Sequence, residues 1–253
     1  MKLRGLLLGA AVALTMAPPA LAERASDGNV SIIYWQAPSI LNPYLSSGTK
    51  DIESSSLVIE PLGRYTETGA MVPYLAKEIP TVANGGVSAD LKSITWKLKD
   101  GLMWSDGTPV TSADVKFTAD YCMNPDGGCS QLAKFDHVTS VETPDASTVV
   151  VSFAQPMPNP YGPFMGGQSP IIQKAQFENC VGAQAQSCTE QNFGPIGTGP
   201  FVVTEFRPND VIQMKANDNY RDPSKPAFAT LTFKGGGDAM GAGRSVLETG
   251  EFD

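Results

Sequence analysis

The densest group of reactive side chains lies in Trp104–Val115, WSDGTPVTSADV, which holds two carboxylates and several hydroxyls within a short stretch. Two carboxylates so close in sequence could act as a general acid and a general base. Local structure explains them differently. Asp106-Gly107 is a turn dipeptide, and Thr111–Asp114 matches the capping box that begins a helix. We therefore interpret the segment as a turn followed by a helix start, with no free acid–base pair.

Other residue types that carry catalysis form no recognisable motif. His137 is the only histidine, so it has no histidine partner, and it lies at the start of an expected strand. The sequence has no Gly-x-Ser-x-Gly nucleophile elbow. The glycines after Lys234 match neither the dinucleotide nor the phosphate-loop pattern. These observations predict no enzyme, no metal site and no cofactor.

The four cysteines form two local pairs, Cys122 with Cys129 and Cys180 with Cys188. Disulfides are the usual interpretation in an exported chain, and the first residues of this chain, described next, indicate export. Zinc would require closer spacings or a histidine partner, and neither pair offers them. Each local disulfide would close a short loop worth roughly 2.5 kcal/mol in the chain-entropy model. We expect two structural disulfides, paired locally on proximity alone.

The first residues have the features of an export signal. Lys2 and Arg4 precede the apolar run Gly5–Met16, and Ala20-Leu21-Ala22 fits a cleavage site. The run is shorter than the ~20 residues that a membrane-spanning helix needs. We therefore expect residues 1–22 to be a signal peptide cleaved after Ala22. The mature protein would be soluble and periplasmic.

The mature chain would be strongly acidic. Removing two basic residues from 18 leaves 16 against 26 acidic ones, a net charge of −10. Binding to nucleic acid favours a basic surface, so this composition argues against a nucleic-acid partner. No later segment is apolar for long enough to cross a membrane.

Strands and short helices follow one another along the mature chain. Strict alternation predicts a strand at Leu91–Lys99, and a turn between two β-rich runs predicts a hairpin of Val138–Glu142 and Thr148–Phe153. Helices are expected at Lys50–Ile59 and from Asp238 to Thr249, the second ending at Gly250. Further strands are expected at Asn29–Gln36, Phe201–Phe206, Val211–Lys215 and Phe228–Lys234. The pattern predicts a mixed α/β chain with two structural units.

Several motifs, in order, resemble one family. They are YWQAPSILNP at Tyr34–Pro43, LKDGLMWSDGTPVTSADV at Leu98–Val115, PIGTGPF at Pro195–Phe201, NDNYRD at Asn217–Asp222 and the segment Lys234–Asp253. Together they resemble the family 5 extracellular solute-binding proteins, the peptide- and nickel-type receptors of ABC importers. The resemblance covers essentially all of the mature chain. The two cysteine pairs depart from the common form of the family.

The resemblance implies a mixed-sheet α/β fold, the periplasmic-binding-protein-like type II (cluster C) fold. It implies a first lobe made of residues 23–60 and 191–253, with an α+β subdomain inserted at residues 61–190. The family is about twice as long as this chain. We therefore expect an N-terminal fragment that is truncated before the second lobe, which would be largely missing.

The resemblance also implies a function without chemistry. Such a receptor is a monomer that captures a peptide or peptide-like ligand between two lobes and delivers it to a membrane-embedded ABC permease. The loop Ser46, Ser47, Gly48 and Thr49 should face the cleft, and Trp35, Gln36 and Asp238 are weaker candidates. Trp35 is equally well explained as a core or interlobe aromatic residue, and Asp238 as a charge near a helix N-terminus.

Alternatives remain open within the family and outside it. Nickel chelates, sugars and opines are other ligands of similar receptors, although the single histidine disfavours direct nickel binding. An exported hydrolase without a recognisable motif, or an interaction module without a small ligand, is also compatible with the sequence. Since half of the contacts would be absent, we expect the fragment to bind peptide weakly or not at all.

Overall fold

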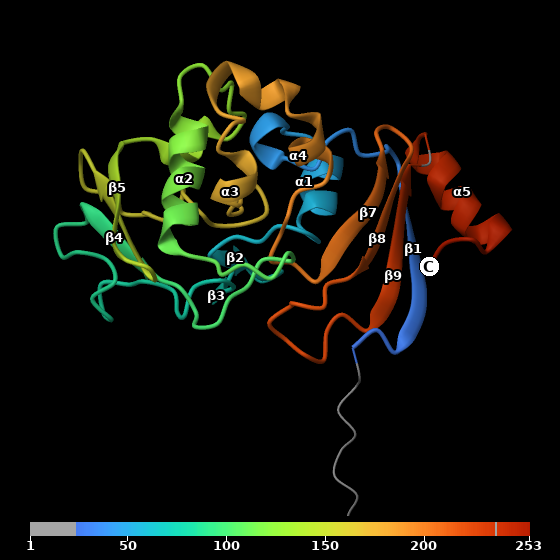
Figure 1. Ribbon diagram of the computed structural model, residues 1–253, viewed down its shortest axis with the longest axis horizontal. Coiled ribbons are helices and arrows are strands. Elements are labelled where there is room, and N and C mark those ends of the chain that lie inside the picture. Colours follow the sequence, from blue (N-terminus) through green and yellow to red (C-terminus); the bar gives the residue numbers. More distant parts are fainter. Residues whose placement is uncertain (1–23, 236) are drawn as a thin grey trace, which may run out of the picture.

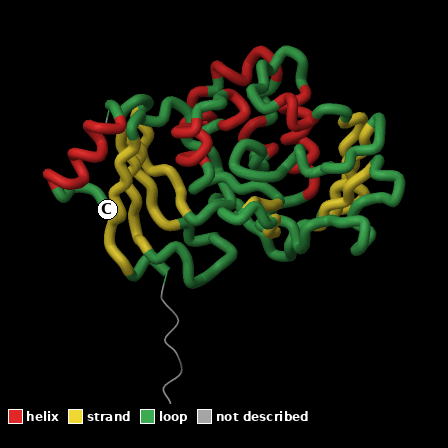
Figure 2. The backbone as a smooth tube through the Cα atoms, turned by 180° about the vertical axis from the view of Figure 1, so that it is seen from behind, coloured by secondary structure: helices red, strands yellow, loops and turns green. Residues whose placement is uncertain are grey.

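The computed structural model describes residues 24–235 and 237–253. The expected signal peptide, residues 1–22, lies outside the described residues. Figure 1 shows an elongated molecule with a four-stranded sheet at one end and a three-stranded sheet at the other. Figure 2 shows from behind that most of the helical segments lie between the two sheets. No helix in the described part of the chain is long and apolar enough to cross a membrane.

The four-stranded sheet has mixed strand directions. Its order is β1-β9-β8-β7, formed by β1 (Asp27–Tyr34), β9 (Phe228–Gly235), β8 (Val211–Ala216) and β7 (Phe201–Arg207). β1 and β9 run parallel from the pair Asp27/Phe228 to the pair Tyr34/Gly235, and the other neighbours are antiparallel. The predicted strands are confirmed, except that β1 ends at Tyr34, two residues before Gln36.

The three-stranded sheet has the order β4-β6-β5. It consists of β4 (Ser93–Lys97), β6 (Thr148–Phe153) and β5 (Val138–Asp145), so the predicted hairpin is confirmed. The alternating side chains Ile94, Trp96 and Leu98 are buried, as the period-2 pattern predicts. Helix α2 (Ser112–Met123) lies against β5 and β6 and covers this sheet.

The two sheets have separate hydrophobic cores. The larger core gathers around the three-stranded sheet and includes Trp96, Trp104 and Phe164. The smaller core is formed by the four-stranded sheet together with Leu41, Val58 and Ile59. Residues near both ends of the described chain therefore build the smaller core, and the segment between them builds most of the larger core.

The smaller elements pack mostly around the larger core. They are β2 (Gly63–Tyr65), β3 (Met71–Pro73), α3 (Lys174–Phe177), α4 (Thr189–Phe193) and the 3₁₀ turns Pro43–Leu45, Leu132–Phe135 and Gly182–Ser187. The helix α5 (Ala239–Thr249) packs against β1 and ends at Gly250, whose φ of 64° is left-handed. Both local disulfides are confirmed, Cys122–Cys129 and Cys180–Cys188.

Helix α1 (Thr49–Ser55) is shorter than the predicted helix, which extended to Ile59. Serine hydroxyls bond to carbonyls of the same helix, because Ser54 Oγ donates to Lys50 O at 2.7 Å and Ser55 Oγ donates to Ile52 O at 3.0 Å. Such bonds compete with helical hydrogen bonding. The following carbonyl of Val58 is taken by the N–H of Gly199 at 2.8 Å, which directs the chain out of the helix.

The segment Trp104–Val115 folds as its sequence predicts. Asp106 accepts bonds from the N–H and hydroxyl of Thr108, at 2.9 and 2.6 Å, and so closes the turn. Asp114 Oδ2 accepts the N–H of the N-cap residue Thr111 at 2.9 Å, which is half of the predicted capping box. Its carboxylates therefore support local structure.

Candidate functional site

Helix α1 lies between the two parts of the molecule and begins at the end of the predicted loop Ser46–Thr49. Gly48 is its N-cap residue and Thr49 its first residue. Ser47 and Thr49 are exposed, whereas Ser46 and Gly48 are partly buried. The loop therefore presents two hydroxyl side chains and backbone groups at one surface, while its other residues anchor it.

The anchor is Asp51, which is only 1% exposed. Its carboxylate accepts bonds from Ser39 N at 2.7 Å, from Ser46 Oγ at 2.7 Å and from Lys50 Nζ at 2.9 Å. Burial alone would raise the pKa of Asp51, but these hydrogen bonds outweigh burial and hold it below its usual value. The carboxylate therefore stays charged and ties the loop to the start of α1.

One hollow lies at the carboxyl ends of the parallel strands β1 and β9. We call it the strand-end hollow; its volume is about 400 Å³ and it is lined by Gln36, Ala37, Lys50, Asn209, Gly235 and Gly237. Gly235 permits the close approach of the chain there, since a Cβ at that position would lie 2.3 Å from Ala37 N. Ligands commonly bind outside the carboxyl ends of strands in open α/β sheets.

A second hollow lies on another side of α1. We call it the helix-side hollow; its volume is about 250 Å³ and its lining residues are Ile52, Glu53, Ser56, Arg64, Tyr65, Gly166 and Gly167. Arg64 Nη2 donates to Ser56 O at 3.0 Å and its guanidinium stacks 4.7 Å from the Tyr74 ring centre. The hollow thus contains one fixed cation and one carboxylate.

Tyr34 and Trp35 lie between the strand-end hollow, which Gln36 lines, and the helix-side hollow, which Glu53 lines. The Tyr34 hydroxyl donates to Glu53 of the helix-side hollow. Burial and this carboxylate raise the pKa of Tyr34 to about 12, so the phenol stays protonated. Trp35 stacks on Tyr34 with ring centres 4.0 Å apart, and it remains 40% exposed. Trp35 is therefore a surface aromatic residue rather than a core residue.

The structure brings some of the predicted residues together and separates others. Gln36 shares the strand-end hollow with Gly235 and Gly237. Asp238 is exposed and acts as the N-cap of α5, where its side chain accepts the N–H of Gly241 at 2.8 Å. The sequence prediction missed other lining side chains: Lys50, Glu53, Arg64, Tyr65 and Asn209. The available sequence signal was the cluster of charged residues Lys50, Asp51 and Glu53, which directly follows the predicted loop.

The strand-end hollow and the helix-side hollow together present positively and negatively charged side chains. Amide, ammonium, guanidinium and carboxylate groups line the two hollows beside exposed backbone. In the part of the chain that the structure describes, no group of three or more His, Cys, Asp or Glu residues is placed to hold a metal ion. The arrangement suits a polar ligand with several hydrogen-bonding groups.

Comparisons with known proteins identify the family to which the chain belongs. Residues 70–253 match the sequence profile "Bacterial extracellular solute-binding proteins, family 5 Middle". A Brucella ovis protein named as an ABC transporter peptide-binding protein is 31% identical over 135 residues, which are 53% of this chain and 25% of that protein. The chain thus spans about a quarter of the length of this relative.

Solved structures extend the similarity to the fold. The ABC transporter substrate-binding protein CtaP of Listeria monocytogenes is 27% identical with a TM-score of 0.75, covering 90% of this chain and 44% of CtaP. NikZ of Campylobacter jejuni, solved in complex with Ni(L-His), is 25% identical with a TM-score of 0.73, covering 90% of this chain and 43% of NikZ. The chain belongs to the family 5 bacterial extracellular solute-binding proteins and has their mixed α/β, type II periplasmic-binding-protein fold.

Proposed function

We propose that the chain is the first-lobe part of the periplasmic substrate-binding component of an ABC importer, with a peptide or peptide-like ligand. The observation that carries the proposal is the strand-end hollow, which is lined by Lys50, the residue directly after the anchored loop Ser46–Thr49. Exposed loop backbone can pair with an extended peptide backbone, and a polar hollow can receive a side chain. The Brucella ovis relative named for peptide binding supports this ligand class.

The two hydrophobic cores support a division of the chain into two parts, except that Tyr44 packs in the larger core. We propose that the smaller core is the first lobe, residues 23–60 and 191–253, and that the larger core is the inserted subdomain, residues 61–190. In this division the candidate loop belongs to the first lobe, and both strands that form the strand-end hollow belong to it too. The ligand would then be closed in by a second lobe and delivered to a membrane permease as a monomeric complex.

A nickel chelate is the second candidate ligand, because NikZ was solved with Ni(L-His) and shares this fold. A chelate supplies its own metal ligands, so the receptor needs only hydrogen bonds and charges. The charged groups of the helix-side hollow could supply these. The two candidates differ in charge and shape, which allows one experiment to compare them.

Isothermal titration of the protein, expressed with any reading frame that follows codon 253, tests the proposal. The probes are a mixed peptide pool and Ni(L-His). We expect saturable binding of peptides, and Gln36→Ala should weaken it about fivefold, the effect of one lost hydrogen bond. The exposed Gln186→Ala is the matched control and should change nothing. Binding of Ni(L-His) alone, or equal effects of both variants, would reject the peptide assignment.

A further inference from the structure

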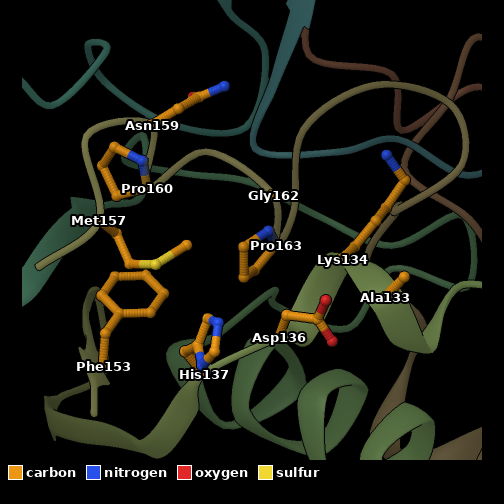
Figure 3. A pocket seen from close by; sticks show the side chains of 10 residues that line it. All are labelled: Ala133, Lys134, Asp136, His137, Phe153, Met157, Asn159, Pro160, Gly162 and Pro163. Carbon is orange, nitrogen blue, oxygen red and sulfur yellow. The ribbon is translucent and has the colours of Figure 1, made fainter. Parts of the chain in front are cut away.

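A third hollow lies in the larger of the two parts, away from α1. We call it the subdomain hollow; its volume is about 320 Å³ and it is lined by Ala133, Lys134, Asp136, His137, Phe153, Met157, Asn159, Pro160, Gly162 and Pro163. Figure 3 shows these side chains from close by. The residues come from the turn Leu132–Phe135, the start of β5, the end of β6 and the following loop. None of them lines either hollow beside α1.

The backbone shapes this hollow from two sides. Gly162 lies so close to the turn Leu132–Phe135 that a Cβ there would be 2.6 Å from Lys134 O. His137 has a left-handed φ of 63°, which is uncommon for a residue with a side chain. Its carbonyl accepts the N–H of Ala154 at 2.8 Å and holds that conformation in place. The walls are therefore set by close backbone contacts.

One wall of the subdomain hollow is apolar. Phe153, Pro160 and Pro163 are buried, and Met157 is partly buried. Figure 3 shows Phe153 and Met157 next to the His137 imidazole, with Asp136 on the other side of that ring. A branched or aromatic side chain of a small ligand would remove apolar surface from water at this wall.

The rim carries one charge of each sign. Lys134 and Asp136 form no ion pair with each other, nor with any other charged side chain in residues 24–235 and 237–253. Lys134 is partly buried, and this burial lowers the pKa of its ammonium. A partly desolvated ammonium without a carboxylate gains from an anionic partner. Asp136 is exposed and can meet a cation.

We propose that the subdomain hollow is a second binding site, which takes a small zwitterion with an apolar side chain, such as a free aliphatic amino acid. The ligand carboxylate pairs with Lys134, its ammonium pairs with Asp136, and its side chain lies against Phe153 and Met157. A ligand with a single charge would meet one like charge at the rim, whereas a zwitterion complements both. This site is distinct from the peptide site proposed beside α1.

Titration of the protein with three matched probes tests this site. The probes are L-leucine, leucinamide, which lacks the carboxylate, and 4-methylpentanoic acid, which lacks the amine. We expect L-leucine to bind saturably and each analogue to bind about tenfold more weakly. Lys134→Met should abolish the preference for leucine over leucinamide, and Asp136→Asn should abolish its preference over 4-methylpentanoic acid.

Two further variants make the result decisive. Ala133→Trp fills the hollow from an exposed position and should abolish binding while the protein keeps its thermal unfolding midpoint. Gln36→Ala, in the strand-end hollow, should leave all three affinities unchanged. The absence of saturable leucine binding, unchanged preferences in the two charge variants, or loss of leucine binding in Gln36→Ala would each overturn the assignment.

Discussion

At the scale of single residues, the motif PIGTGPF needs its glycines because two backbones touch. A Cβ at Gly197 would lie 1.8 Å from Val58 O, and one at Gly199 would lie 2.6 Å from Leu57 O. Gly199 N also donates to Val58 O at 2.8 Å. The motif therefore joins the returning chain to the segment after α1.

Gly197→Ala should destabilise the protein by roughly 3 kcal/mol, because the methyl group must displace the backbone of Val58. Urea denaturation measures the change. Gly28→Ala is the control, since a Cβ there meets nothing within 4 Å, and it should change stability by less than about 0.5 kcal/mol. Similar effects of the two variants would contradict the packing explanation.

Asp145 should make the folded protein lose stability more steeply as the pH falls from 4 to 2. Hydrogen bonds from the backbone and hydroxyl of Ser147, with a side-chain bond from Thr148, lower the pKa of Asp145 to about 2 in the folded state. The unfolded chain, whose aspartate pKa is 3.8, therefore binds a proton more readily, so the stabilisation is present above pH 3.8 and is lost as the pH falls to about 2.

The variant Asp145→Asn keeps an acceptor for these bonds but cannot titrate. Its thermal unfolding midpoint should therefore fall less than that of the wild type between pH 4 and pH 2. Glu178→Gln, at an exposed site, is the control. If the unfolding midpoints of the wild type and Asp145→Asn fall by the same amount between pH 4 and pH 2, Asp145 does not cause the acid destabilisation.

At the scale of elements, side chains join helices and loops that are distant in sequence. Asp114 caps α2 and also accepts the N–H of Lys174, the first residue of α3, at 3.0 Å. The two disulfide-closed loops touch as well, because a Cβ on Gly182 would lie 3.2 Å from Asn124 Oδ1. These contacts hold the helices over the larger core.

The double variant Cys180→Ala/Cys188→Ala should lose roughly 2.5 kcal/mol of unfolding free energy, because the unfolded chain gains the entropy of an open loop. Urea denaturation of the oxidised proteins measures this loss. Adding a reductant to a Cys122→Ala/Cys129→Ala protein should reproduce the effect of removing the second disulfide. A loss below about 0.5 kcal/mol would show that the disulfide does not constrain the unfolded chain.

At the scale of the whole molecule, one largely buried ion pair, Glu60 with Arg221, lies where the two parts meet, because the Arg221 guanidinium also lies 5.5 Å from the centre of the Tyr74 ring. Glu60 is 1% exposed and follows directly on Val58 and Ile59 of the smaller core. It accepts Arg221 Nη2 at 3.0 Å and Thr198 Oγ1 at 3.2 Å, and its own carbonyl accepts Ile171 N at 2.9 Å. Burial opposes the charge of Arg221, but Glu60 outweighs burial and raises the pKa of Arg221.

Arg221→Met should destabilise the protein by roughly 3 kcal/mol or more, because it leaves Glu60 buried without a cation. The double variant Arg221→Met/Glu60→Gln should recover a large part of the loss, and a double-mutant cycle in urea measures the recovery. An additive cycle would show that the pair contributes no coupling. We also expect Arg221→Met to separate the unfolding of the two cores, which tryptophan fluorescence and circular dichroism would report as non-coincident transitions.

The sequence by itself determined most of the local structure of this protein, although not the end of α1 at Ser55. Period-2 burial at Ile94, Trp96 and Leu98, the helix cap at Thr111 and the helix stop at Gly250 depend on neighbouring residues, so the pattern predicted them correctly. The disulfide pairs and the family resemblance were also readable, since both rest on short, ordered motifs.

Only the tertiary structure decided how distant segments form the candidate site. Gln36 and Gly235 line one hollow because β1 and β9 pair in parallel, a contact that local patterns do not encode. The role of Asp51 as an anchor depends on Ser39 and Ser46 reaching it together. Long-range pairing and burial set these positions, and neither follows from the spacing of residues along the chain.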